Sequence, residues 1–108
     1  MSLDVYLRCE HCGSSLYDRN ITHNLGKMAG EAEIYEALWR PEEIGITHAH
    51  QLLSPLSEGL ARLTKDPAKY KAFNPENGWG DYDVLVGFVT DYLLACGKNP
   101  NAKVEASR

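Results

Sequence analysis

The sequence predicts an α+β fold with an N-terminal β-hairpin, three or four helices and a C-terminal strand that completes a small sheet. Apolar residues alternate with polar ones near both ends of the chain, which is typical of half-buried strands. In the middle of the chain they recur at helical spacing instead. The 108 residues suffice for one hydrophobic core. We therefore expect a single globular domain over residues 1–108.

The strands are predicted at residues 3–8, 14–21 and 101–107. The segment CEHCG between the first two is interpreted as a hairpin turn, and SSLYDRNI as the returning strand, although its alternation is poorer. The alternation itself is carried by Leu3, Val5 and Leu7 in the first strand and by Ala102, Val104 and Ala106 in the third. The expected order of elements is β-β-α-α-α-β.

The first helix is predicted to begin after Thr22, whose hydroxyl can cap it. It ends at or before Arg40, because the residue before a proline disfavours helical angles and residue 41 is a proline. Gly26 and Gly30 lie inside its apolar pattern and cost about 1 kcal/mol each relative to alanine. They indicate a close approach of another element or a local break.

The remaining helices carry clearer signals at their ends. One is expected to begin at Thr47 and to kink at Pro55, because its apolar stripe stays in phase across the proline. A short helix follows the cap Asp66. The last runs from about Tyr82 to Cys96, and the following glycine is expected to end it.

Composition excludes several classes of function. The net charge is −4 and the 11 basic residues are scattered, whereas nucleic-acid binding requires clustered Lys and Arg. No apolar run approaches the ~20 residues that cross a membrane. The N-terminus MSLDVYLRC lacks the pattern of a secretory signal. We therefore expect a cytoplasmic protein with neither a nucleic-acid nor a membrane partner.

The cysteines form one pair and one isolated residue. Cys9 and Cys12 have the spacing of half a tetrahedral zinc site, but there is no second pair, and Cys96 lies on the apolar stripe of the last helix. The four histidines do not follow a zinc-finger spacing. A redox role is disfavoured, because a catalytic C-x-x-C normally opens a helix and this one joins two strands. The pair is either a structural zinc knuckle or a turn without metal.

The second candidate site is the start of the first helix. Unpaired backbone N–H groups and the helix dipole favour an anion there. His23 and Asn24 add side-chain donors, while Tyr35, Trp39 and Arg40 end the same helix. A Gly-rich turn further along the chain adds amide and aromatic groups. These parts suit a planar, anionic, nucleotide-like ligand. The predicted ligand-binding residues are His23, Asn24, Arg40, Asn77, Trp79 and Tyr82.

In this hypothesis His23 and Asn24 bind the anion, Trp79 and Tyr82 stack on the ligand, and Arg40 neutralises charge. The alternative is that the aromatic residues are core and the cap residues point into water. The two ends of an unbroken first helix would lie roughly 25 Å apart. One pocket can include both only if the helix breaks at one of its glycines or a second subunit completes the site, as a homo-oligomer would allow.

An enzymatic role is the third hypothesis. His23 could serve as the general base of a hydrolase, but the sequence has no nucleophile motif, no paired acid and no Gly-rich phosphate loop. His48 and His50 would point about 200° apart on a helix, so we expect them to be separate exposed residues. The residues therefore favour a binding protein without catalysis.

Four segments resemble a group of small proteins from bacteriophage and bacterial genomes. They are NITHNLGKMA, YEALWRPEEIGIT, FNPENGWGDYD and YLLAC, and the likeness covers nearly the whole chain after the first hairpin. The group brings no established activity. Its N-terminal hairpin varies, which implies that CEHCG is a local addition and that a metal there would be structural. A phage setting suggests a protein that sequesters a host nucleotide signal.

Overall fold

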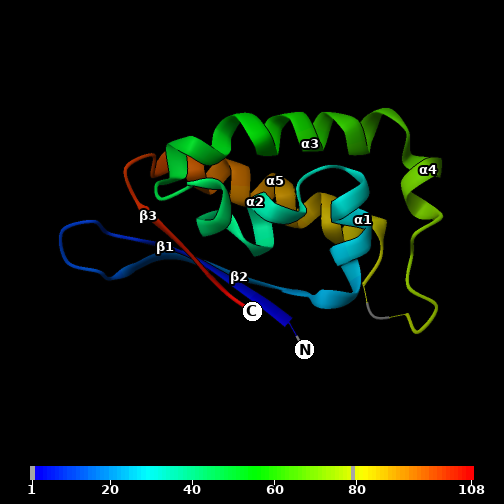
Figure 1. Cartoon of the computed structure of the whole chain (residues 1–108), viewed down its shortest axis with the longest axis horizontal. Coiled ribbons are helices and arrows are strands. Elements are labelled where there is room, and N and C mark those ends of the chain that lie inside the picture. The colour runs from blue at the N-terminus through cyan, green and yellow to red at the C-terminus, as the bar shows by residue number, and fades with distance from the viewer. Residues whose placement is uncertain (1, 79) are drawn as a thin grey trace.

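A computed structural model describes residues 2–78 and 80–108 of the chain. It confirms the predicted α+β class, with the helices of the described chain gathered on one side of a three-stranded antiparallel sheet (Figure 1). The strands follow the order β2-β1-β3, and the hairpin and the C-terminal strand lie where the alternation predicts them. Their bounds are Ser2–Arg8 for β1, Ser15–Thr22 for β2 and Lys103–Ser107 for β3.

The buried face of the sheet follows from the alternation in β1. Leu3, Val5 and Leu7 are each 0% exposed and point toward the helices. On the same face, Tyr17 of β2 stacks on Tyr92 of the long helix α5 (Tyr82–Lys98), with ring centroids 5.9 Å apart. An ion pair between Arg19 and Asp91 joins the same two elements. The sheet and α5 therefore form the base on which the other helices pack.

The predicted cap Asp66 is confirmed, since its carboxylate accepts a hydrogen bond from the backbone N–H of Lys69 at 3.3 Å and begins α4 (Pro67–Lys71). Asp81, which had not been predicted as a cap, accepts from the backbone N–H of Val84 at 2.9 Å and begins α5. Helix α5 continues to Lys98, two residues past its predicted end. Gly97 does not end it, because an α-helical glycine on an exposed surface costs little compared with the packing of the rest of this helix.

The second predicted helix divides into two segments, and its proline lies in the first turn of the second. A 3-10 turn, η3 (Ala49–Leu52), leads directly into α3 (Leu53–Lys65). Pro55 is the third residue of α3, where the backbone N–H has no partner within the helix and can be lost without penalty. The residue that caps η3 is His48 and not Thr47. The apolar stripe stays in phase across Pro55 because two helical segments, η3 and α3, follow each other without a gap.

The prediction of a single first helix is wrong. The chain forms η1 (His23–Leu25) and α1 (Gly26–Glu31), reverses, and continues as α2 (Tyr35–Trp39) and η2 (Pro41–Ile44). We call the reversal at residues 32–34 the α1–α2 turn. Glu33 has a φ of 63°, and the backbone N–H of Ile34 donates to the carbonyl of Ala29 at 3.0 Å.

The physical reason for the reversal lies on α3. A Cβ added to Gly59 would be 2.1 Å from Cγ2 of Ile34, so the glycine provides the space into which Ile34 packs. Ile34 and Ala32 are both 0% exposed. Burying these side chains favours the reversal over a continuous helix, which would project them away from α3. As a result, α2 lies beside α1 (Figure 1), and the side chain of Trp39 at the end of α2 reaches His23.

None of the helices in the described part of the chain has the length and apolar character that a membrane crossing requires.

Candidate functional site

His23 lies where β2 passes into η1. Its predicted cap is confirmed, since Oγ1 of Thr22 accepts a hydrogen bond from the backbone N–H of Asn24 at 3.3 Å. Nδ1 of His23 is 3.1 Å from Nε1 of Trp39, an indole that is only 1% exposed. An indole N–H can only donate, so Nδ1 must accept. This hydrogen bond therefore fixes a neutral imidazole with its proton on Nε2.

The second nitrogen of the same ring has no partner. Nε2 of His23 is buried and makes no hydrogen bond among the described residues. A buried N–H that is unpaired costs about 1–3 kcal/mol, and native proteins rarely leave one unexplained. His23 itself is only partly buried, so its surroundings reach the surface. Nε2 is covered in the structure, so it can donate to a ligand oxygen only after a neighbouring side chain moves aside.

Trp39 of α2 contacts this histidine, and Tyr35 of the same helix packs on Trp39. Tyr35 stacks on Trp39 with ring centroids 5.2 Å apart and planes 8° apart. A Cβ on Gly26 would lie 3.4 Å from the Tyr35 ring, so the first turn of α1 packs closely against it. The His23 and Trp39 rings are 6.2 Å apart and tilted by 53°. Sequence spacing places Tyr35 and Trp39 on one helix face, but the contact with His23 depends on the α1–α2 turn.

Arg40 lies at the end of α2, and its charge is already matched. Its guanidinium donates to Oε2 of Glu43 at 2.8 Å. Hydrogen bonds to Glu43 and then to Tyr35 raise the pKa of Arg40 above its ordinary value. The side chain remains 40% exposed. An anion could therefore reach Arg40, but it would have to compete with Glu43 or share the guanidinium with it.

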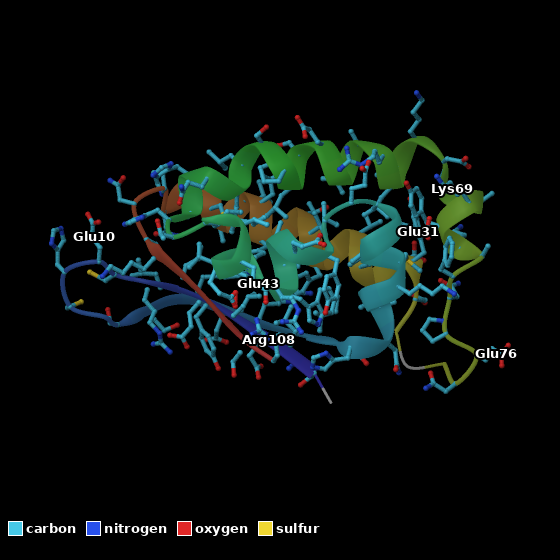
Figure 2. All side chains as sticks on the ribbon, in the orientation of Figure 1. Glu10, Glu31, Glu43, Lys69, Glu76 and Arg108 are labelled. Carbon is cyan, nitrogen blue, oxygen red and sulfur yellow. The ribbon has the colours of Figure 1, made fainter. Side chains whose placement is uncertain are left out.

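A second arginine at α2 could not be predicted. Arg108 donates to the backbone carbonyl of Trp39 at 2.7 Å and to Oε1 of Glu42 at 2.6 Å. Arg108 is the last residue of the sequence, and its side chain reaches α2 from the sheet side (Figure 2). No local pattern in the sequence relates residue 108 to residue 39.

The Gly-rich turn lies against η1. A Cβ on Gly80 would be 2.8 Å from Cγ2 of Thr22 and 3.1 Å from Cδ1 of Leu25. The two segments that were predicted to share a site are thus neighbours in one chain. A second subunit is therefore not needed to bring them together. Trp79 lies outside the described residues, and Asn77 is exposed on the same turn.

Tyr82 occupies a different position from the one predicted. It is 7% exposed, and its hydroxyl donates to the backbone carbonyl of Leu63 at 2.6 Å. Its backbone N–H donates to Oδ1 of Asn74 at 2.8 Å. Burial raises the pKa of its phenol. Tyr82 therefore anchors the start of α5 to α3, and little of its ring is left for a ligand to stack on.

The predicted cysteine pair lies in the β1–β2 turn, which comprises residues 9–14. The backbone N–H of Gly13 donates to the carbonyl of Cys9, and that of Cys9 donates to the carbonyl of Ser14, both at 2.8 Å. Sγ of Cys12 lies 3.1 Å from Oγ of Ser14. Hydrogen bonds from Ser14, and then from the Cys9 thiol, lower the pKa of Cys12 to about 7. Burial raises the pKa of Cys96 to about 12.

The β1–β2 turn does not contain a complete metal site. Among residues 2–78 and 80–108, no three His, Cys, Asp or Glu side chains are arranged to hold a metal ion. A tetrahedral structural zinc needs four ligands, of which Cys9 and Cys12 could supply two. Structural zinc at this pair stays a prediction, to be tested by metal analysis of the purified protein.

His11 belongs to the same turn, and His48 lies beside it. Glu10 lies between the two, with its carboxylate 3.8 Å from Nε2 of His11 and 3.6 Å from Nε2 of His48. The rings of His48 and His50 stack with centroids 5.9 Å apart, so the prediction that they point in opposite directions is wrong. His48 has extended backbone angles and precedes η3, and helical geometry does not apply to it.

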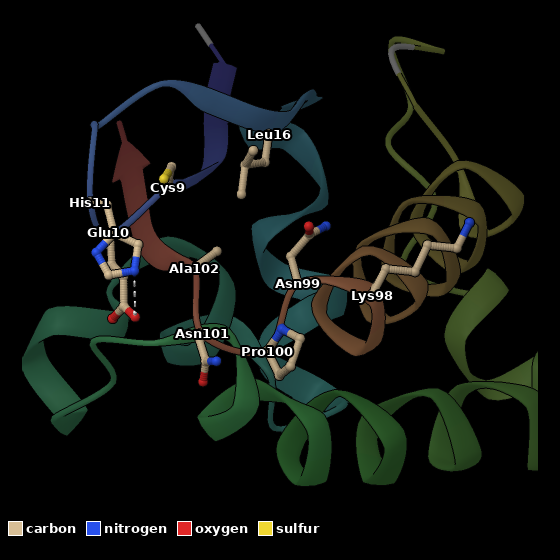
Figure 3. A pocket seen from close by; sticks show the side chains of 9 residues that line it. All are labelled: Cys9, Glu10, His11, Leu16, Lys98, Asn99, Pro100, Asn101 and Ala102. Carbon is tan, nitrogen blue, oxygen red and sulfur yellow. Dashed lines mark ion pairs between the residues drawn. The ribbon is translucent and has the colours of Figure 1, made fainter.

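A depression of about 310 Å³ lies between the β1–β2 turn and the end of α5 (Figure 3). Cys9 and Leu16 line one side, and Lys98 and Asn99 line the other. Leu16 is 49% exposed because the β1–β2 pairing shifts register here, which leaves it without a cross-strand partner. A register shift of this kind has no clear signal in the sequence.

Comparisons with models of protein families, with characterised proteins and with solved structures give no match to this chain.

Proposed function

We propose that this protein binds a small anionic, nucleotide-like molecule, without transforming it, at the surface formed by η1 and α2. The observation that carries the proposal is the unpartnered Nε2–H of His23. Trp39 fixes this nitrogen as a donor, and a donor withdrawn from water is stabilised when an anionic oxygen accepts from it. A phosphate or carboxylate oxygen is the acceptor that this geometry favours.

The neighbouring side chains suit the rest of such a ligand. Asn24 is exposed one residue further along η1 and offers an amide donor. Arg40 retains free N–H positions, because a guanidinium has five donors and Glu43 takes only part of them. The Gly-rich turn beside Thr22 brings Asn77 to the same end of the molecule, and Trp79 remains the residue proposed to stack on a base.

The state of His23 favours binding over catalysis. A general base must present a lone pair to the proton that it removes. Nδ1 of His23 already accepts from Trp39, and Nε2 carries the proton. In this tautomer the imidazole is a donor and has no lone pair available, which argues against the hydrolase hypothesis. Binding without turnover is also what sequestration of a signalling nucleotide would require.

The proposal is tested by thermal-shift and calorimetric titration with adenosine monophosphate, a cyclic dinucleotide, inorganic phosphate and uncharged adenosine. We expect stabilisation by at least one of the phosphorylated compounds and none by adenosine. The decisive variant is His23→Asn, whose Oδ1 can still accept from Trp39 while nothing replaces Nε2. Losing a hydrogen bond to a charged acceptor should weaken binding roughly 10-fold or more.

His50→Asn is the matched control, because His50 is exposed and stacks on His48 beside the β1–β2 turn, away from η1. It should bind as the unmodified protein does. If no anion stabilises the protein, the proposal fails. Equal affinity of His23→Asn and the unmodified protein would show that the ligand does not contact Nε2.

A further inference from the structure

The β1–β2 turn has features that the proposed ligand binding does not account for. Its two thiols are three residues apart, Cys12 is exposed, and Cys9 is partly exposed. Cys96, by contrast, is 0% exposed within the core. The molecule thus presents one accessible pair of thiols and one thiol that solutes cannot reach.

The hydrogen bonds of the turn bring this pair together. The bond from Gly13 N–H to the Cys9 carbonyl closes a single helix-like turn, and Gly13 has a φ of 73° that ends it. In helical geometry, Cα atoms three residues apart are about 5 Å apart. Disulfides are found at Cα separations of about 4.4–6.8 Å. The pair can therefore be bridged without opening the turn.

We propose that Cys9 and Cys12 form a dithiol site that exchanges with low-molecular-weight disulfides of the glutathione class and closes into an intramolecular disulfide. The proposal is independent of the ligand site at His23, which lies at the other end of β2.

The exchange has two steps, and the exposure of the thiols sets their order. The Cys12 thiolate attacks one sulfur of the small disulfide, whose S–S bond breaks, and the other half leaves as a thiolate with the bonding electron pair. Cys9 then loses its proton to solvent and attacks Sγ of Cys12, which releases the second half as a thiolate. Two protein thiols are oxidised to one disulfide, and the small disulfide is reduced to two thiols.

The local chemistry supports Cys12 as the attacking group. Cys12 is exposed whereas Cys9 is only partly exposed, so a small disulfide reaches Cys12 first. Oγ of Ser14 lies 3.1 Å from Sγ of Cys12 and can donate a hydrogen bond to the thiolate. We expect Cys12 to react faster than Cys9 with a small disulfide. Burial of Cys96 predicts that it does not react in the folded protein.

The test uses the full chain, first reduced and then incubated in buffers of oxidised and reduced glutathione. Intact mass and peptide mapping should show loss of two hydrogens and a Cys9–Cys12 bridge, with Cys96 still reduced. Cys9→Ser should stop at a glutathione adduct on Cys12, because the resolving thiol is gone. Cys12→Ser should form its adduct on Cys9 more slowly. Cys96→Ser is the control and should behave as the unmodified protein.

Three results would overturn the proposal. The first is an unmodified protein that accumulates separate adducts on both residues without a bridge. The second is a Cys12→Ser variant that reacts as fast as Cys9→Ser. The third is purified protein that carries stoichiometric zinc and exchanges only after a chelator removes it, which would assign both thiols to a metal.

Discussion

The chain reverses direction at the α1–α2 turn and at the β1–β2 turn, and the two reversals are held in different ways. The α1–α2 turn is packed against the core through Ala32 and Ile34, which are buried, while Glu33 between them is exposed. Ile34 packs into the space at Gly59, and Nε of Arg62 donates to the carbonyl of Ala32 at 2.8 Å. The β1–β2 turn is exposed from Glu10 onward and is closed by its own backbone hydrogen bonds.

This difference matches the chemistry that each turn brings together. The packed turn fixes His23 against Trp39 and thereby sets which nitrogen carries the proton. A recognition group benefits from being held rigidly, because little ordering remains to be done when a ligand binds. The exposed turn leaves the Cys12 thiol open to solutes, as an exchange reaction requires. Packing thus favours recognition at one reversal, and exposure favours reactivity at the other.

The largest expected effect comes from breaking the packed reversal with Gly59→Ala. The new methyl group would meet Cγ2 of Ile34 at 2.1 Å, so α3 and the α1–α2 turn must move apart. Overpacking of this kind costs about 1–3 kcal/mol, and the rigid backbone on both sides favours the upper part of that range. Urea denaturation measures the change in the free energy of unfolding.

Gly87→Ala on α5 is the matched control. A Cβ at Gly87 would meet nothing within 4 Å, so this substitution should raise stability by up to ~1 kcal/mol through helix propensity. In the background of Gly59→Ala, Ile34→Ala should cost less than it does alone, because it removes the clash. Additive effects of the two substitutions would show that Ile34 and Gly59 do not constrain each other.

The outer features of the fold were predictable because their signals are local. Thr22, Asp66 and Asp81 cap the helices that follow them, and each cap needs only a side chain and a backbone N–H two or three residues away. The alternation of apolar and polar residues in β1 can likewise be read from that segment alone. The α1–α2 turn has a distant cause, since Gly59 lies on another helix. Gly30 pointed to a break in the right region, yet the positive φ belongs to Glu33.

The candidate site shows the same limit. The sequence identified His23 as a donor and placed Cys9 and Cys12 together, because these inferences use only side-chain chemistry and short spacing. It could not identify Trp39 as the partner of His23, since that contact depends on the reversal. Tyr82 was predicted to stack on a ligand, whereas its hydroxyl binds the Leu63 carbonyl in the core. A tyrosine beside a Gly-rich turn looks the same in sequence in both roles.

An intermediate effect is expected from Trp39→Phe, which keeps an aromatic ring beside Tyr35 but removes the N–H that binds His23. The loss of a buried hydrogen bond and of part of the indole should cost about 2 kcal/mol. Nitrogen chemical shifts of the His23 ring report the tautomer directly. We expect the proton to be fixed on Nε2 in the unmodified protein and to be shared between both nitrogens in the variant.

Tyr35→Phe controls for changes to the aromatic pair. It keeps the stacked ring and the indole, and it removes only the hydroxyl near Arg40, so the His23 tautomer should not change. If Trp39→Phe leaves the proton on Nε2, the indole does not set the tautomer, and the contrast between a fixed and an open site would lose its main support.

The smallest effects on stability are expected at Gly13 and Glu33, the residues with positive φ in the two reversals. The two substitutions should change stability in opposite directions. Gly13 has a φ of 73° and no atom within 4 Å of an added Cβ, so Gly13→Ala should cost about 1 kcal/mol through backbone strain alone. Glu33 already bears that strain at φ 63°. Glu33→Gly should relieve it and gain at most ~1 kcal/mol, reduced by the greater freedom of glycine in the unfolded chain.

The comparison between these two variants measures how much each turn depends on its surroundings. Strain at φ near 60–75° is a property of the backbone, and the greater freedom of glycine in the unfolded chain reduces both the cost at residue 13 and the gain at residue 33, so the two values should be about equal in size. Chemical denaturation of both variants gives the two values. A much larger cost at residue 13 would mean that contacts with the rest of the molecule also constrain the β1–β2 turn. The thiols would then be held as rigidly as His23, and exposure alone would distinguish the two sites.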